Sequence, residues 1–175
     1  INFRVINAFI PVFWTRELGT SPEQGSFALT VFFSIGIFMT YIGGLLGDKY
    51  GPIKIIRLSL LLWLPSMFLL PQVPEFSATI MLPLGYLLLI IIGAAKALSY
   101  SPVIVLGQTY LAKSIGFAAG VTLGVSQTIG GIIAPVVGNI ADTYSLPVAM
   151  MTLVPFLLIG LIASLFLKDP KKLGL

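Results

Sequence analysis

The sequence has 175 residues, of which 57% are hydrophobic and only 9% are charged. A typical soluble domain is about 25% charged, so this chain has too few polar side chains to cover a soluble globule, and we expect lipid to surround most of it. The chain contains no Cys and no His, which argues against disulfides, metal sites and Cys–His or Ser–His catalysis. We therefore expect neither an enzyme nor a cofactor, and we assign the formal charge of +4 to membrane topology and not to nucleic-acid binding.

Six apolar segments follow one another along the chain. We expect helices at about residues 1–14, 26–46, 53–70, 78–110, 116–140 and 147–167. The first is shorter than the roughly 20 residues that a membrane span needs, so we expect it to be truncated, and the fourth is long enough for Pro102 to kink it. The sequence predicts an all-α transmembrane bundle of six helices over residues 1–175, with three-helix units at about 1–71 and 78–167.

Basic residues collect at one end of the predicted bundle. Arg16 falls at the other end, and the basic residues of the richer end are Lys49, Lys54, Arg57, Lys113, Lys168, Lys171 and Lys172. Lys and Arg are enriched on the cytoplasmic side of membrane proteins. We therefore expect this end and the C-terminus to be cytoplasmic, with Trp14 and Tyr144 near the outer interface.

Two cations stand inside apolar segments. Arg4 lies about 15 Å along a helix from Trp14, which puts it near the bilayer midplane, on one face with Asn7. A cation at that depth is costly unless it is hydrated or paired, so we expect Arg4 to bind an anionic group in a cavity; the alternative is that it reaches out to the cytoplasmic surface. Lys96 is flanked by Gly, Ala and Leu, and we expect it to face a wet cavity or to form a structural ion pair.

Three further observations concern the later helices. Gln127 is a cavity candidate because an amide is costly to bury, whereas Thr122 and Ser126 can bond to their own backbone; Gln108 is a second candidate, near the cytoplasmic end of the fourth helix. Small residues at regular spacing let helices approach closely. We expect such a helix-packing face at Gly116, Gly120, Gly124, Gly130 and Gly131.

A short polar stretch, Gly43 to Lys54, joins the second and third apolar segments. Taken alone, it is a solvated turn in which Gly51 ends one helix and Pro52 starts the next. It also resembles the loop signature of the major facilitator superfamily of secondary transporters, with Gly47 in place of Ala and Pro52 in place of a basic residue. The residues that match in order are Gly44, Leu46, Asp48, Lys49, Gly51 and Lys54. The resemblance implies a cytoplasmic gating loop that latches two halves of a transporter.

A longer resemblance is to the fosmidomycin-resistance branch of that superfamily. It rests on Phe9 to Pro11 with Trp14, on Gly43 to Gly51, on Tyr100 to Gln108 and on Gly116 to Asp142. It implies the C-terminal half of a twelve-helix fold, two inverted three-helix repeats, a prokaryotic inner membrane, and export of a drug or small anionic compound coupled to proton entry. The partner would be the N-terminal half or a second copy. Thr109 stands where some relatives carry Glu, which puts a coupling role for that stretch in doubt.

A six-helix scaffold without transport activity is the alternative function. It would use the glycine face for partners and would have no use for two cations inside the membrane. Arg4 and Lys96, with no deep carboxylate beside them, instead favour a transporter for an anionic substrate. An intramembrane enzyme is disfavoured because the chain lacks His, Cys and paired intramembrane carboxylates.

Overall fold

The structure is a computed structural model that describes residues 2–167, with the backbone alone for residues 2–4 and 126. Within that range the chain is helical and contains no strand. In chain order the elements are α1 (Asn2–Arg16), α2 (Pro22–Tyr50), α3 (Pro52–Leu69), η1 (Leu70–Glu75), α4 (Ala78–Tyr110), η2 (Ala112–Ser114), α5 (Ile115–Ala119), η3 (Gly120–Val125), α6 (Ser126–Thr143), α7 (Leu146–Met151) and α8 (Val154–Leu165).

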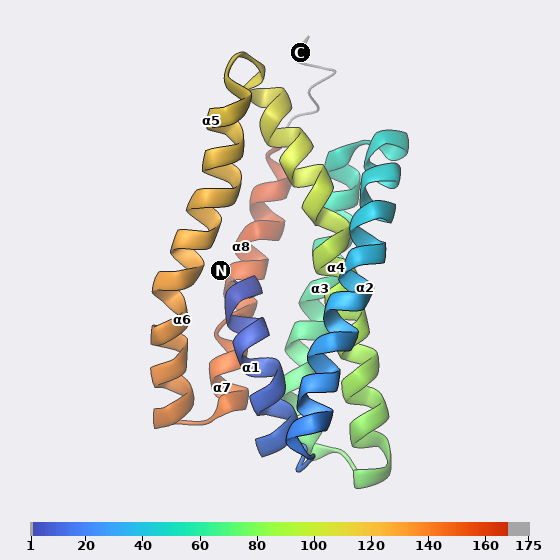
Figure 1. Ribbon diagram of the computed structural model, residues 1–175, viewed down its shortest axis with the longest axis vertical. Helices are drawn as coiled ribbons and strands as arrows, with labels where there is room; N and C mark the ends of the chain where they lie inside the picture. The colour runs from blue at the N-terminus through green and yellow to red at the C-terminus, as the bar shows by residue number, and fades with distance from the viewer. Residues whose placement is uncertain (1, 168–175) are drawn as a thin grey trace.

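These elements form the predicted all-α transmembrane bundle (Figure 1). Five stretches are long and apolar enough to cross a membrane: Pro22–Tyr50, Pro52–Glu75, Ala78–Tyr110, Ala112–Thr143 and Leu146–Leu165. The sixth segment is α1, which begins near the middle of the bundle and runs to its lower end in Figure 1.

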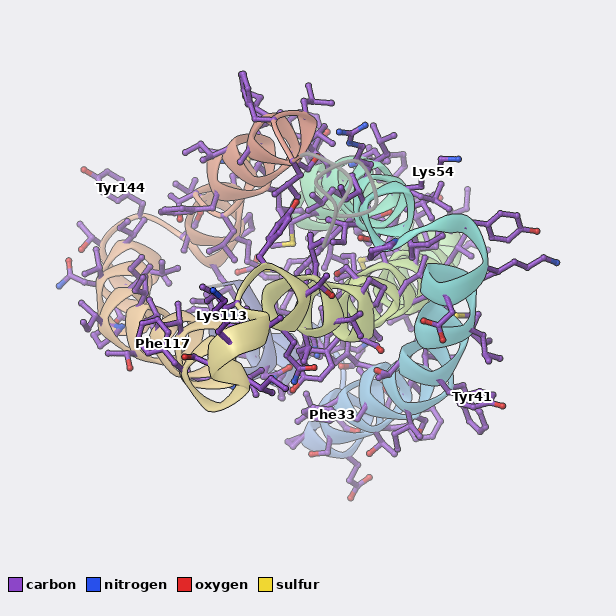
Figure 2. All side chains as sticks on the ribbon, turned by 90° about the horizontal axis from the view of Figure 1, so that it is seen from above. Phe33, Tyr41, Lys54, Lys113, Phe117 and Tyr144 are labelled. Carbon is purple, nitrogen blue, oxygen red and sulfur yellow. The ribbon has the colours of Figure 1, made fainter. Side chains whose placement is uncertain are left out.

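The connections alternate between the two ends of the bundle, as the sequence predicts. The α2–α3 turn and the α4–α5 connection lie at the upper end in Figure 1, and the α1–α2, α3–α4 and α6–α7 connections lie at the lower end. Seen along the bundle, Phe33, Tyr41 and Phe117 project outward from the helices (Figure 2), and all three are exposed. Their rings form part of the apolar surface that a membrane protein presents to lipid or to a further helical unit.

The signature stretch is helical, which corrects the expectation of a polar loop. α2 continues through Asp48 and Lys49 to Tyr50, and the Gly51 N–H closes it with a 2.9 Å bond to the Gly47 carbonyl. Gly51 alone makes the turn, with a positive φ of 95° that glycine adopts without strain, and Pro52 starts α3. The chain can remain helical here because the polar side chains are exposed on the last turn of α2.

Trp14 belongs to the core and does not lie at the lipid interface, contrary to expectation. Its side chain is 0% exposed, and its ring meets the Tyr86 ring edge to face at 5.4 Å between centroids. Gly85 of α4 lies against the same indole, since a Cβ there would be in ordinary contact with it at 3.6 Å. Trp14 therefore gives no measure of the depth of Arg4; α1, the helix that contains Arg4, begins near the middle of the bundle (Figure 1).

Helices α2 and α4 approach closely through glycines that the sequence analysis had placed in the signature. Gly43 faces the Leu98 backbone, Gly44 faces Ser101 and Gly47 faces the Pro102 ring. A missing Cβ lets two membrane helices come into backbone contact. By contrast, a Cβ on Gly116, Gly120, Gly124 or Gly131 would meet nothing within 4 Å among the described residues. The packing role of those glycines, and of Gly130, stays a prediction for a partner outside the described residues.

The last two predicted helices are interrupted. The fifth contains a π-helical segment, η3, between α5 and α6, where two glycines weaken the helix and the Thr122 hydroxyl donates to the Ala118 carbonyl. The sixth breaks between α7 and α8, because Pro155 has no N–H with which to bond back into α7.

Arg57 fixes the C-terminal end of α8 against α3. Its Nε and one terminal nitrogen donate to the Ser164 carbonyl at 3.1 and 2.9 Å, and the same terminal nitrogen donates to the Leu165 carbonyl at 3.3 Å. These carbonyls belong to the last turn of α8, where the Ser164 carbonyl also accepts from the Leu167 N–H at 3.4 Å. The guanidinium adds a charged donor there and complements the negative end of the helix dipole.

Gly43→Ala is expected to destabilise the bundle, because the new Cβ would collide with the Leu98 backbone, which cannot turn aside as a side chain can. Overpacking of this kind costs about 1–3 kcal/mol. Gly36→Ala on the same helix is the matched control, since its Cβ would sit 4.0 Å from the Ala97 Cβ, an ordinary contact. Thermal unfolding in detergent, followed by circular dichroism, should show a lower midpoint for Gly43→Ala alone. Equal midpoints for both variants would contradict this account of the α2–α4 contact.

Candidate functional site

A cavity of about 790 Å³ opens in the middle of the bundle; we call it the Lys96 cavity. It lies where α3, α4 and α8 face the η3–α6 arm, and its size is that of a small-molecule site. It is lined by Thr40, Trp63, Lys96, Ser99, Tyr100, Val103, Ile104, Val121, Thr122, Leu123, Val125, Gln127, Ile129, Phe156, Ile159 and Gly160.

Lys96 supplies the charge of this cavity. It is the only charged residue among the described residues of the lining, and it lies about 21 Å along α4 from Tyr110, near the middle of the helix. Its Nζ is 5.9 Å from the centroid of the Phe32 ring, a distance at which a ring face attracts a cation. Gly93 lets that ring lie against α4, since a Cβ there would come within 3.1 Å of it.

The threonine and serine hydroxyls that line the cavity with Lys96 already donate to backbone carbonyls of their own helical segments. Thr40 donates to the Gly36 carbonyl at 2.8 Å, Ser99 donates to the Lys96 carbonyl at 3.0 Å, and Thr122 donates to Ala118. A hydroxyl has one proton, so these three oxygens can only accept from a molecule in the cavity. The other side chains of the lining that carry N–H or O–H groups are those of Trp63, Lys96, Tyr100 and Gln127.

Most of the remaining lining is apolar. Valine, isoleucine and leucine side chains from α4, η3 and α6 face Phe156 and Ile159 of α8. A cavity with a single cation in an apolar wall suits a molecule with one negative group and an apolar body, because each part then meets a matching surface.

The structure brings together two of the five cavity residues that the sequence predicts. Lys96 and Gln127 line the Lys96 cavity, whereas Asn7 and Gln108 do not. The Asn7 side-chain oxygen is buried and accepts no hydrogen bond within residues 2–167, and Gln108 lies in the last turn of α4. The side chain of Arg4 lies outside the described residues.

Sequence reasoning missed Trp63 as a cavity residue. No periodicity marks it, because it is a single aromatic residue in an apolar helix, and it faces the cavity only through the way α3 packs on α4. Tyr100 had a weak signal, since it follows Lys96 by one helical turn.

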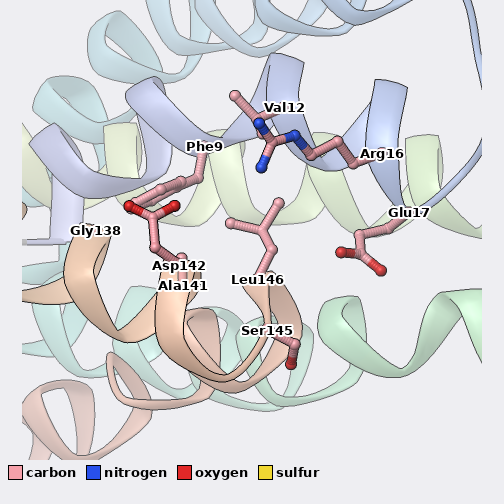
Figure 3. Close-up of a pocket in the computed structure, with 9 residues that line it drawn as sticks. All are labelled: Phe9, Val12, Arg16, Glu17, Gly138, Ala141, Asp142, Ser145 and Leu146. Atoms are coloured by element: carbon pink, nitrogen blue, oxygen red, sulfur yellow. The ribbon is translucent and has the colours of Figure 1, made fainter.

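A second, smaller cavity of about 350 Å³ lies at the opposite end of the bundle from Lys54, between the end of α1 and the α6–α7 connection. Figure 3 shows the charged groups of Arg16, Glu17 and Asp142 around it. No three metal-ligating side chains come together among the described residues. The charged groups of Arg16, Glu17 and Asp142 make this cavity polar. It shares no lining residue with the Lys96 cavity.

Comparison with known proteins shows the family. Residues 1–174 match the model of the Major Facilitator Superfamily, and the chain belongs to that family. It is 30% identical over 151 residues to YfnC of Bacillus subtilis, named as an MFS-type transporter, and 29% identical over 164 residues to the Fosmidomycin resistance protein of Escherichia coli. These matches cover 86% and 94% of the chain but 35% and 38% of the relatives, so the chain spans little more than a third of their length. No solved structure matches it. With its apolar spans, the chain is an integral membrane protein.

Water should reach the Lys96 cavity, and a chain without cysteine allows this to be tested by labelling. Gln127→Cys is expected to react with a water-soluble methanethiosulfonate reagent in membranes, because Gln127 lines the cavity. Leu61→Cys, on an exposed apolar face of α3 outside the cavity, is expected to stay unmodified, because a thiol in lipid does not ionise. Equal labelling of both positions would refute a separate wet cavity.

Proposed function

Because the chain belongs to the Major Facilitator Superfamily, we propose that it is part of a secondary active transporter that carries a small anionic compound through the Lys96 cavity by alternating access. The observation that carries the proposal is the position of Lys96: a cation in the middle of an apolar span that lines a cavity of ligand size. An ionisable residue inside the membrane marks a substrate or ion pathway by default, and transporter sites lie near the midplane.

We assign the chain to the C-terminal six-helix half of a twelve-helix fold, with inverted three-helix repeats at about 1–71 and 78–167. The match covers 35% and 38% of the relatives, as a match to one half of a longer transporter would. The uncovered glycine face of the η3–α6 arm fits a surface that meets the N-terminal half or a second copy. The basic end of the bundle, with Lys49, Lys54 and Lys113, would face the cytoplasm of a prokaryotic cell across its inner membrane.

We further propose that transport is proton-coupled export of a drug or similar anion. One relative is named for fosmidomycin resistance, and export is the direction that would protect a cell. The carboxylates of the described residues lie near helix ends, at Glu17, Glu23, Asp48, Glu75 and Asp142. The proton carrier would therefore belong to the other half of the transporter, or coupling would run through Lys96.

Transport of labelled fosmidomycin in proteoliposomes tests this function. The full-length protein is expected to move the compound when a pH gradient is imposed. Lys96→Gln should slow this movement at least about tenfold, because losing a charge-assisted contact to the anion corresponds to 1.4 kcal/mol or more. Lys113→Gln is the matched control, since Lys113 is exposed in η2 and lies outside the cavity, and it should stay within about twofold of the wild type. Arg4→Ala, assayed beside them, tests the second predicted cation.

Each result has a distinct meaning. Equal rates in Lys96→Gln and the wild type would remove Lys96 from the pathway while leaving a transporter. If the folded, inserted wild type moved neither fosmidomycin nor any of a panel of small carboxylates and phosphonates, transport would be refuted and the six-helix scaffold favoured.

A further inference from the structure

Trp63 lies in the wall of the Lys96 cavity and carries a hydrogen-bond donor that meets no acceptor among the described residues. Its side chain lines the cavity and is 8% exposed. Its indole N–H is buried and has no hydrogen-bond acceptor among the described residues. A buried donor without an acceptor is destabilising, and such groups are rare in folded proteins unless they serve a purpose.

Trp63 and Lys96 lie at similar depths on neighbouring helices. Trp63 is about 16 Å along α3 from Pro52, and Lys96 is about 21 Å along α4 from Tyr110, measured from the same end of the bundle. One helical turn of about 5 Å therefore separates their levels. A small molecule in the cavity can span that difference and meet both groups.

The chemistry of the two groups is complementary to one kind of ligand. The Lys96 ammonium and the indole N–H both donate, and neither can accept. The nearby hydroxyls of Thr40 and Ser99 have given their protons to their own helices, so they do not compete for the acceptors of a ligand. A carboxylate or phosphonate offers several acceptor oxygens to such a pair, and the Trp63 ring adds apolar surface beside them.

We propose that Trp63 determines substrate specificity in the Lys96 cavity, donating its indole N–H to an oxygen of an anionic substrate whose charge Lys96 holds. This inference rests on the proposed transport function and adds to it a residue and a substrate class: small carboxylates or phosphonates that also carry an apolar portion. The N–H is buried in the conformation described, so the indole ring turns toward the cavity when the anion binds.

The test compares two tryptophans, each with a buried indole N–H that has no acceptor among the described residues. Trp14 also carries a buried indole N–H without an acceptor, but it lies in the core and lines neither cavity. Trp63→Phe and Trp14→Phe each remove one N–H and keep an aromatic ring. Initial rates of fosmidomycin transport by the full-length protein in proteoliposomes, over a range of concentrations, give KM and the maximal rate for each variant.

Trp63→Phe is expected to raise KM at least about tenfold, as the loss of a hydrogen bond to a charged group does, with the maximal rate within about twofold of the wild type. Trp14→Phe should leave KM unchanged. Fosmidomycin should also shift the tryptophan emission of the wild type and not that of Trp63→Phe, because the shift reports the environment of that indole.

Two outcomes would overturn the inference while leaving transport intact: a wild-type KM in Trp63→Phe, or an equal rise of KM in both variants. A wild type that is folded and inserted but moves no anion would overturn both the inference and the proposed function. A lower maximal rate with unchanged KM would identify Trp63 as a structural residue and would also contradict the proposal.

Discussion

A lysine cannot lie in the middle of a membrane span without water, a partner or a ligand. Burying an ammonium in hydrocarbon is costly, and α4 places Lys96 near its midpoint. The surroundings meet this constraint: the Phe32 ring lies near the ammonium, Gly93 makes room for that ring, and Lys96 lines a cavity of about 790 Å³. The cavity, its polar lining and the proposed choice of an anionic substrate all follow from that single charge.

The rest of the bundle holds this arrangement in place. Backbone contact between α2 and α4, which Gly43 allows, sets the distance between Phe32 and Lys96. Arg57 also fastens the end of α8 to α3, the two helices that carry Phe156 and Trp63 of the cavity lining. The η3–α6 arm closes the cavity with a π-helical segment at Thr122. Such segments often occur at functional sites because they interrupt the regular helix.

Composition and hydropathy predicted the helical bundle and the alternation of its ends, because lipid imposes these features on any spanning chain. They also predicted that Lys96 faces a cavity, and it lines one. The other features depend on how the helices pack against one another, and the sequence alone does not reveal that packing. Trp14 was expected at the interface, but its ring packs against Phe13 and Tyr86 in the core. The second helix was expected to end at about residue 46, yet α2 continues to Tyr50, and both Gly43 and Gly47 pack against α4. Trp63 carried no signal at all, since only the angle between α3 and α4 turns it toward the cavity.

The most direct measurement is an electron cryo-microscopy structure of the full-length protein with bound fosmidomycin. We expect density for the phosphonate beside the Lys96 ammonium, within a cavity that a second helical unit completes. Density for the compound away from Lys96, or a Lys96 cavity open to lipid with no second unit against it, would contradict the account.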